Sequence, residues 1–106
     1  MFHLPPEKID VVIHPQSIVH SMVEFVDGSS KAQLGPPDMK VPIQFALSYP
    51  ERWKSDHEVL DWSETRSLDF EAPDLRKYPS LGLAFEALRQ GGAVPAILNA
   101  ANEIAV

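Results

Sequence analysis

Apolar residues recur along the chain in short runs, and prolines separate most of these runs from one another. The β-branched run at 9–13 (IDVVI) predicts a short, largely buried strand. Residues 18–26 and 30–34 predict two further strands, the first with apolar positions on both faces. One face would pack on helices, and the other on a second domain or subunit. Leu68 and Phe70 alternate with charged residues over 67–71, which predicts a fourth, half-exposed strand.

The turn between residues 18–26 and 30–34 carries the strongest local signal. Asp27-Gly28 favours a two-residue hairpin turn with positive φ. That turn would place Glu24 opposite Lys31, a cross-strand charge pair worth ~0.2–1 kcal/mol.

The same register predicts one wall of a ligand pocket. It places His20 opposite Gly35 and brings the loop around Ser17 beside the proline-stiffened segment 35–39. Gly35 has no side chain, so space remains opposite His20. An apolar wall with a few placed polar groups is typical of a ligand site.

Helices are expected in the rest of the chain, which gives an α+β class. The sheet, small and mixed or antiparallel, would have its β-hairpin packed against helices and be followed by a linker and C-terminal helices. Asp38 is the expected N-cap of a helix that runs to about Ser48 or Tyr49. Ser80 would cap a second helix that Gly91-Gly92 closes, and a third would begin near Pro95. Residues 51–66 predict a long irregular connection, packed through Trp53 and Trp62.

Composition excludes several classes of function. A net charge of −6 without a Lys/Arg cluster argues against nucleic-acid binding. The absence of cysteine excludes disulfides and thiolate metal sites. No apolar run reaches the ~20 residues that span a bilayer, and no secretory or transit segment is evident, which favours a cytoplasmic location in a bacterium. The apolar start and the uncapped last helix predict a piece of a longer protein.

Several sequence blocks carry a family resemblance. They are HPQSIVHS at 14–21, DGS at 27–29, AQLGPPDM at 32–39, the PD…YPSLGLA stretch at 73–84, and LNAANE at 98–103. Together, in this order, they resemble deoxyxylulose-phosphate reductoisomerase over essentially the whole chain.

The resemblance implies an enzyme and this chain's place in it. Members convert deoxyxylulose phosphate to methylerythritol phosphate in non-mevalonate isoprenoid biosynthesis, using NADPH and a divalent metal (Mg or Mn). They are homodimers that fosmidomycin inhibits. Residues 1–50 would belong to the central catalytic domain, 51–79 to a connecting arm, and 80–106 to the start of the C-terminal helical domain. The dinucleotide domain, the metal ligands and an Asn-Lys phosphate-binding stretch would lie outside this fragment, which would be inactive alone.

The resemblance also assigns site residues. Ser17 would donate a hydrogen bond to the substrate or its phosphate. His20, the catalytic candidate, would bind a substrate hydroxyl or phosphate, or order a water. Pro37 and Met39 would line the substrate pocket, with Met39 also near the nicotinamide.

Each assignment has a structural alternative. Without the resemblance, Ser17 is more typical of a loop serine that caps backbone groups. His20 is then more typical of an ordinary half-buried strand histidine, and Met39 of packing in a core or at a helix start. His14 is expected to be structural, and with His20 it makes too small a set for a metal site. A polar stripe on the last helix, formed by Asn99, Asn102 and Glu103, is expected to be solvated.

A second function class remains open from the sequence. The chain could be a non-catalytic module that associates with itself through an exposed edge of the hairpin. A native stop after residue 106 would favour that module, whereas a longer reading frame would favour an enzyme fragment.

Overall fold

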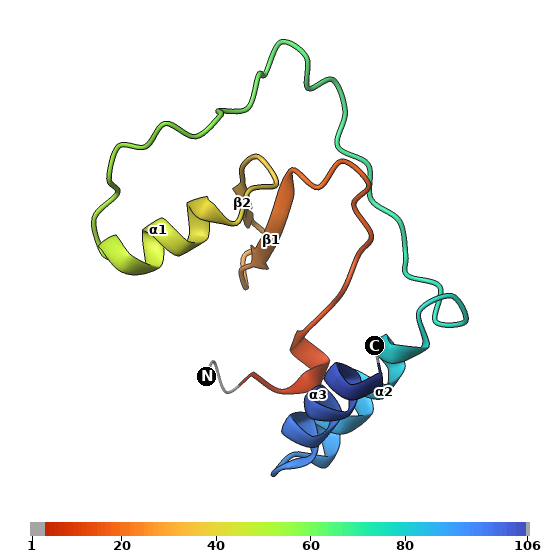
Figure 1. The fold of residues 1–106 in the computed structure, drawn as a ribbon. Coiled ribbons are helices and arrows are strands. Elements are labelled where there is room, and N and C mark those ends of the chain that lie inside the picture. The colour runs from red at the N-terminus through yellow and green to blue at the C-terminus, as the bar shows by residue number, and fades with distance from the viewer. Residues whose placement is uncertain (1–3, 106) are drawn as a thin grey trace. The chain divides into compact units, whose positions relative to one another are not determined.

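The computed structural model describes residues 4–105, and the chain divides into two compact units. Among these residues, one unit is 14–70 and the other joins 4–13 to 71–105. The fold is α+β, as predicted (Figure 1). In chain order the elements are the short 3₁₀-helix η1 (Pro6–Lys8), β1 (Val19–Glu24), β2 (Ser30–Leu34), α1 (Lys40–Ser48), α2 (Pro79–Gln90) and α3 (Val94–Ala105).

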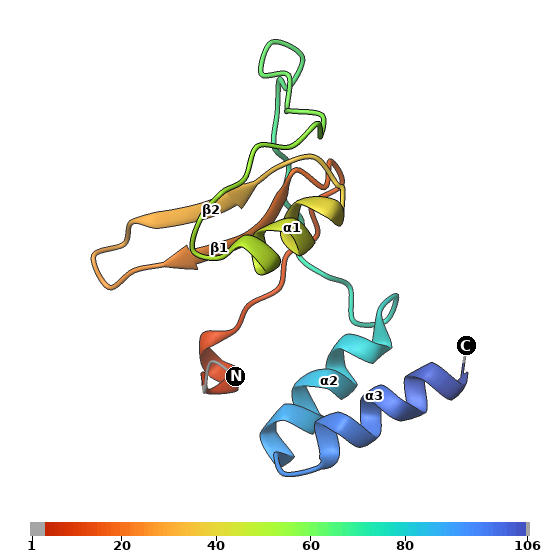
Figure 2. The same ribbon diagram turned by 60° about the vertical axis from the view of Figure 1, so that its left-hand side comes forward.

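Strands β1 and β2 form a two-stranded antiparallel hairpin (Figure 2). The Phe25 N–H donates to the Ser29 carbonyl at 2.8 Å, and the Gly28 N–H donates to the Phe25 carbonyl at 2.9 Å. Gly28 has a φ of 80°, in the left-handed region that glycine adopts without strain. The connection is therefore a three-residue loop, Val26 to Gly28, with its last residue in the left-handed conformation.

The predicted two-residue turn, and the register drawn from it, are wrong. Glu24 lies opposite Ser30, and Lys31 lies opposite Val23, so the expected Glu24–Lys31 pair does not form. A two-residue turn of the expected type needs positive φ at both central residues. In this turn Gly28 has a positive φ, whereas Asp27 before it does not.

A bulge at His20 shifts the ladder once more. Val19 pairs with Leu34 and Ser21 with Gln33, so His20 is the extra residue of β1. The Gly35 N–H donates to the Ile18 carbonyl at 3.0 Å. The backbone opposite Gly35 is therefore that of Ile18, and not that of His20 as predicted.

The strands predicted at 9–13 and 67–71 reduce to one bridge between Ile13 and Glu71. The two residues exchange N–H to carbonyl bonds of 2.8 and 2.9 Å. Ile9 and Val12 are 39% and 43% exposed, so the expected buried strand is wrong. Pairing at a single residue leaves the rest of each run without the neighbouring strand that a ladder needs.

Aspartate side chains fix four corners of the chain. In each case a carboxylate oxygen accepts the backbone N–H two residues ahead, at 2.8–2.9 Å. This Asx turn mimics a backbone turn and is a common role of aspartate in loops. The four pairs are Asp27 with Ser29, Asp38 with Lys40, Asp61 with Ser63, and Asp74 with Arg76.

Helix α1 begins where the second of these turns ends. Asp38 satisfies the Lys40 N–H as a capping residue would, although the helix itself starts at Lys40 with Met39 at the N-cap position. The Gln44 amide then ties the helix to the irregular connection. Its Nε2 donates to the Trp53 carbonyl at 3.1 Å, and its Oε1 accepts from His57 Nε2 at 3.0 Å.

The connection over residues 51–66 contains no helix or strand, as predicted. Trp53 and Trp62 are 59% and 63% exposed, so the expectation that they pack this segment is wrong. The polar contacts of Gln44, and those of Asp61 within its own turn, hold the segment instead.

Helices α2 and α3 lie side by side in the second unit (Figure 2). Pro79 is the first residue of α2, a position where its missing N–H costs nothing, so Ser80 is not the N-cap as predicted. Gly91 ends the helix as predicted, with a φ of 68° and its N–H donating to the Ala87 carbonyl at 3.0 Å.

Few side chains of the described residues are buried. Ala87 in α2 and Ser48 in α1, 4% and 6% exposed, are the ones that fall in this class. Large apolar side chains such as Val26, Leu47 and Ile104 remain mostly exposed. Local hydrogen bonds therefore fix much of the backbone conformation within each unit.

No helix within residues 4–105 has the length and apolar character needed to cross a membrane.

The hairpin turn gives a prediction about the pKa of Asp27. That pKa is lowered, first because the Ser29 hydroxyl donates to the carboxylate at 2.6 Å and second because the Ser29 N–H does so. We expect Ser29→Ala to raise the pKa toward its ordinary value, as measured by NMR titration of the Asp27 carboxyl. Ser30→Ala is the control, and an unchanged pKa in Ser29→Ala would contradict the assignment.

The same shift sets the sign of the pH dependence. Because the folded pKa of Asp27 lies below its unfolded value, the stabilisation is fully present above the unfolded pKa. It is lost as the pH falls through the folded pKa. In Ser29→Ala, the stability of the turn should therefore fall less as the pH is lowered through this range.

Candidate functional site

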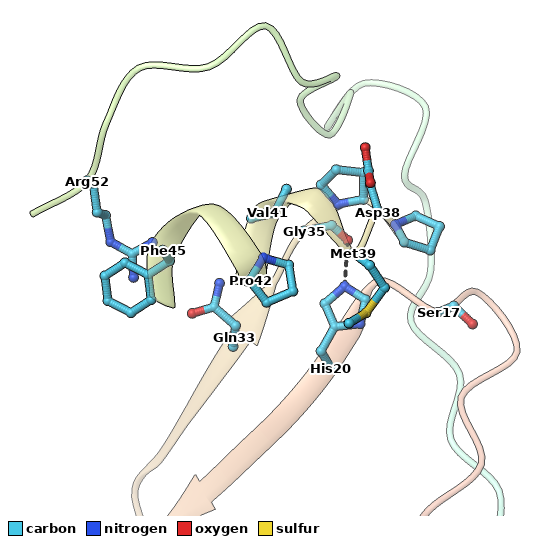
Figure 3. A pocket seen from close by; sticks show the side chains of 12 residues that line it. Ser17, His20, Gln33, Gly35, Asp38, Met39, Val41, Pro42, Phe45 and Arg52 are labelled. Atoms are coloured by element: carbon cyan, nitrogen blue, oxygen red, sulfur yellow. Dashed lines mark hydrogen bonds between the residues drawn. The ribbon is translucent and has the colours of Figure 1, made fainter. Parts of the chain in front are cut away.

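One cavity of about 520 Å³ lies between the end of the hairpin and the first turns of α1 (Figure 3). All of its walls come from the unit of residues 14–70. Most of the lining is apolar or glycine, with a small number of polar side chains, as in typical ligand sites. The lining residues are Ser17, His20, Gln33, Gly35, Pro36, Pro37, Asp38, Met39, Val41, Pro42, Phe45 and Arg52.

The four residues singled out from the sequence all line this cavity. Ser17 precedes β1, His20 is the bulged residue of β1, and Pro37 and Met39 belong to the segment that leads into α1. In Figure 3 the Met39 side chain lies in front of the His20 ring. Ser17 lies to one side, with its hydroxyl directed away from His20.

His20 is held by a backbone carbonyl. Its Nε2 lies 3.2 Å from the Gly35 carbonyl oxygen, marked by the dashed line in Figure 3. A carbonyl oxygen only accepts, so Nε2 carries the hydrogen and donates. Nδ1 of the neutral ring is then free to accept from a ligand hydroxyl, and the protonated ring can donate to an anion.

Ser17 has an unusual backbone conformation. Its φ is 52°, the one positive φ outside glycine among the described residues. The Ser17 N–H donates to the His14 carbonyl at 3.1 Å and closes a turn through Pro15. The left-handed region costs a residue with a side chain ~1–2 kcal/mol. Such outliers concentrate at functional sites, where the surrounding structure maintains them.

Arg52 is a cavity residue that sequence reasoning missed. Its guanidinium carbon lies 4.2 Å from the centroid of the Phe45 ring, a cation–π contact that orients the charged group. The chain leaves α1 at Ser48, and the short segment beyond it returns Arg52 to the helix. The available signal was a basic residue three or four positions after the predicted helix end. Where its side chain lies, however, depends on the path of the connection.

The described residues contain no group of three or more His, Asp or Glu side chains that could hold a metal ion. The polar groups of the cavity are an imidazole, a hydroxyl, amide and carboxylate groups, and one guanidinium. This set can bind hydroxyl and phosphate groups of a small ligand, with proline and methionine providing dry contact.

Comparison with known proteins identifies the family. The model of the DXP reductoisomerase C-terminal domain matches residues 34–106. This chain belongs to the DXP reductoisomerase family. The predicted resemblance is confirmed.

Curated reductoisomerases match the chain over its whole length. The 1-deoxy-D-xylulose 5-phosphate reductoisomerase of Chloroherpeton thalassium is 65% identical over 106 residues, which are 100% of this chain and 27% of the relative. That of Acetivibrio thermocellus is 61% identical, again over 100% of this chain and 28% of the relative. The chain thus spans little more than a quarter of the reductoisomerases that it matches.

Solved reductoisomerases share the fold. The Zymomonas mobilis enzyme in complex with NADPH matches with a TM-score of 0.89 and 52% identity, over 99% of this chain and 28% of that one. A DOX-P reductoisomerase in complex with NADPH, fosmidomycin and magnesium matches with a TM-score of 0.91 and 57% identity, over 98% and 26%. Between them, these structures contain NADPH and a divalent metal, the cofactors that the resemblance implies for the parent enzyme.

The contacts of two histidines predict opposite tautomers in their neutral forms. His20 should carry its hydrogen on Nε2, which donates to Gly35. His14 should carry it on Nδ1, which lies 2.8 Å from the Asp69 carbonyl oxygen. Nitrogen chemical shifts and ring proton couplings measured by NMR distinguish the two forms. An Nδ1–H form at His20 would contradict the assigned contact.

Proposed function

We propose that this chain forms one wall of the substrate pocket in a reductoisomerase that converts deoxyxylulose phosphate to methylerythritol phosphate with NADPH. The reaction belongs to non-mevalonate isoprenoid biosynthesis. The observation that carries the proposal is a cavity that Ser17, His20, Pro37 and Met39 line together, in a chain of this family.

In this proposal Ser17 and His20 bind the polar groups of the substrate. The Ser17 hydroxyl donates to the substrate or to its phosphate, and a bond to an anionic oxygen is stronger than one between neutral groups. His20 is the catalytic candidate. With Nε2 held by Gly35, its Nδ1 faces a substrate hydroxyl, the phosphate or an ordered water.

Pro37 and Met39 supply the apolar part of the wall. Met39 is 71% exposed, so its side chain has free surface for a ligand. We assign it to contact with both the substrate and the nicotinamide ring, where NADPH supplies the hydride when bound. The described residues offer no cluster that could hold the divalent metal.

The parent protein that we propose is a cytoplasmic homodimer. Residues 1–50 belong to its central catalytic domain, 51–79 to the connecting arm, and 80–106 to the start of the helical domain. The pairing of α2 with α3 is consistent with the last assignment.

Strands β1 and β2 form a two-stranded sheet, so each has an outer edge to which a second copy could add. Self-association without catalysis is the competing function, and the match to reductoisomerases over the whole chain favours the enzyme.

The purified chain should not catalyse the reaction by itself. We expect no oxidation of NADPH, followed by absorbance, when the chain is mixed with deoxyxylulose phosphate and Mg²⁺ or Mn²⁺. A complete reductoisomerase under the same conditions is the positive control. Measurable turnover by this chain would overturn its assignment as a contributor of one wall.

Substitutions in the complete enzyme test the site. We expect Ser17→Ala and His20→Gln each to lower kcat/KM by roughly 10- to 100-fold, the range for a lost hydrogen bond to a charged group. Glu24→Gln is the control, because Glu24 lies in β1 and does not line the cavity. Equal losses in all three variants would exclude the proposed roles of Ser17 and His20.

A further inference from the structure

The loop that carries Ser17 is attached to a segment more than fifty residues away. The Gln16 side chain makes two hydrogen bonds with Asp69, which lies 53 positions later. Its Nε2 donates to the Asp69 carboxylate, and its Oε1 accepts the Asp69 N–H at 3.2 Å. Two bonds with opposite donor and acceptor roles fix the orientation of the amide as well as its position.

His14 provides a second attachment to the same segment. Its Nδ1 donates to the Asp69 carbonyl oxygen at 2.8 Å. Its ring stacks on Phe70, with centroids 4.7 Å apart and an interplanar angle of 18°. The other ring nitrogen, Nε2, is buried without a hydrogen-bond partner, so the neutral ring with its hydrogen on Nδ1 suits this environment. Ser67 also donates to the Asp69 carboxylate, at 3.1 Å.

These contacts surround the one strained residue of the cavity. Gln16 immediately precedes Ser17, and the carbonyl of His14, three positions before it, accepts the Ser17 N–H. A left-handed conformation at a serine persists only where neighbouring structure determines it. Gln16 and Asp69 do not line the cavity themselves, so they can influence a ligand only through Ser17 and its loop.

We propose that Gln16 and Asp69 are positioning residues for Ser17. Their pairing holds the loop in the conformation that presents Ser17 to the cavity. The inference rests on the proposed function, because it takes Ser17 as a substrate-binding group. The long connection then has a structural role, because residues 51–69 return the chain to the loop that precedes β1.

The test exchanges the donor and acceptor side chains of the Gln16–Asp69 pair in the complete enzyme. Gln16→Glu places two carboxylates against each other and should lower kcat/KM by roughly 10- to 100-fold, the cost of a small misplacement of a binding group. Adding Asp69→Asn gives the pair a donor again, because the introduced amide can donate to the introduced carboxylate, and should restore most of the loss. The defect should raise the KM for deoxyxylulose phosphate and leave that for NADPH unchanged.

Gln90→Glu is the matched control. The Gln90 Nε2 donates to the Glu86 carboxylate at 3.0 Å in α2, so the same substitution creates the same kind of charge conflict at a residue that does not line the cavity. We expect it to leave kcat/KM unchanged. If Gln16→Glu fails to fold by circular dichroism, Gln16→Leu, which removes both bonds without adding charge, takes its place.

A double-mutant cycle with Ser17→Ala separates this proposal from the one on which it rests. If Gln16 acts through Ser17, its substitution should have little further effect when Ser17 is already alanine. Full additivity, or no restoration by Asp69→Asn, would overturn the positioning role. If Ser17→Ala itself has no effect, the proposed function of Ser17 fails, whatever the Gln16 variants show.

Discussion

The Asx turns are the interaction on which the described structure most depends. With few buried side chains in either unit, corners must be fixed locally, and a carboxylate that accepts the N–H two residues ahead does this without a core. The turn at Asp27 sets the hairpin, and the one at Asp38 starts α1. At Asp27 and Asp61 a serine hydroxyl adds a second bond, and this lowers the pKa of both carboxyls. The corners are therefore most stable with these aspartates ionised.

The elements set by local chemistry could be predicted from the sequence. Gly91 was expected to end a helix because glycine tolerates the left-handed conformation, and the structure has α2 ending there. The register of the hairpin could not be predicted in the same way. Asp27-Gly28 is compatible with a two-residue and a three-residue loop, and the choice moves every cross-strand pair. The strand expected at 9–13 does not form for a different reason. A strand needs a partner strand, and among residues 4–105 only Glu71 pairs with this run.

The cavity shows how a wrong register can still lead to the right neighbours. The prediction set His20 opposite Gly35 in the backbone ladder, whereas the bulge gives that place to Ile18. The imidazole nevertheless reaches the Gly35 carbonyl, because its side chain spans the offset that the bulge creates. The roles of Arg52 and Asp69 could not be predicted from the sequence. Their positions depend on where the irregular connection comes back to the rest of the unit, and local periodicity does not encode that path.

In the block HPQS, one residue lines the cavity and the other three hold the loop that carries it. Only Ser17 of these four residues lines the cavity. Pro15 fixes the turn that the Ser17 N–H closes, His14 stacks on Phe70, and Gln16 pairs with Asp69. A hydroxyl on a free loop would sample many positions, and ordering it would cost conformational entropy when a ligand binds. Under the proposed function, in which Ser17 binds the substrate, anchoring the three residues before it removes that cost in advance and so strengthens binding by Ser17.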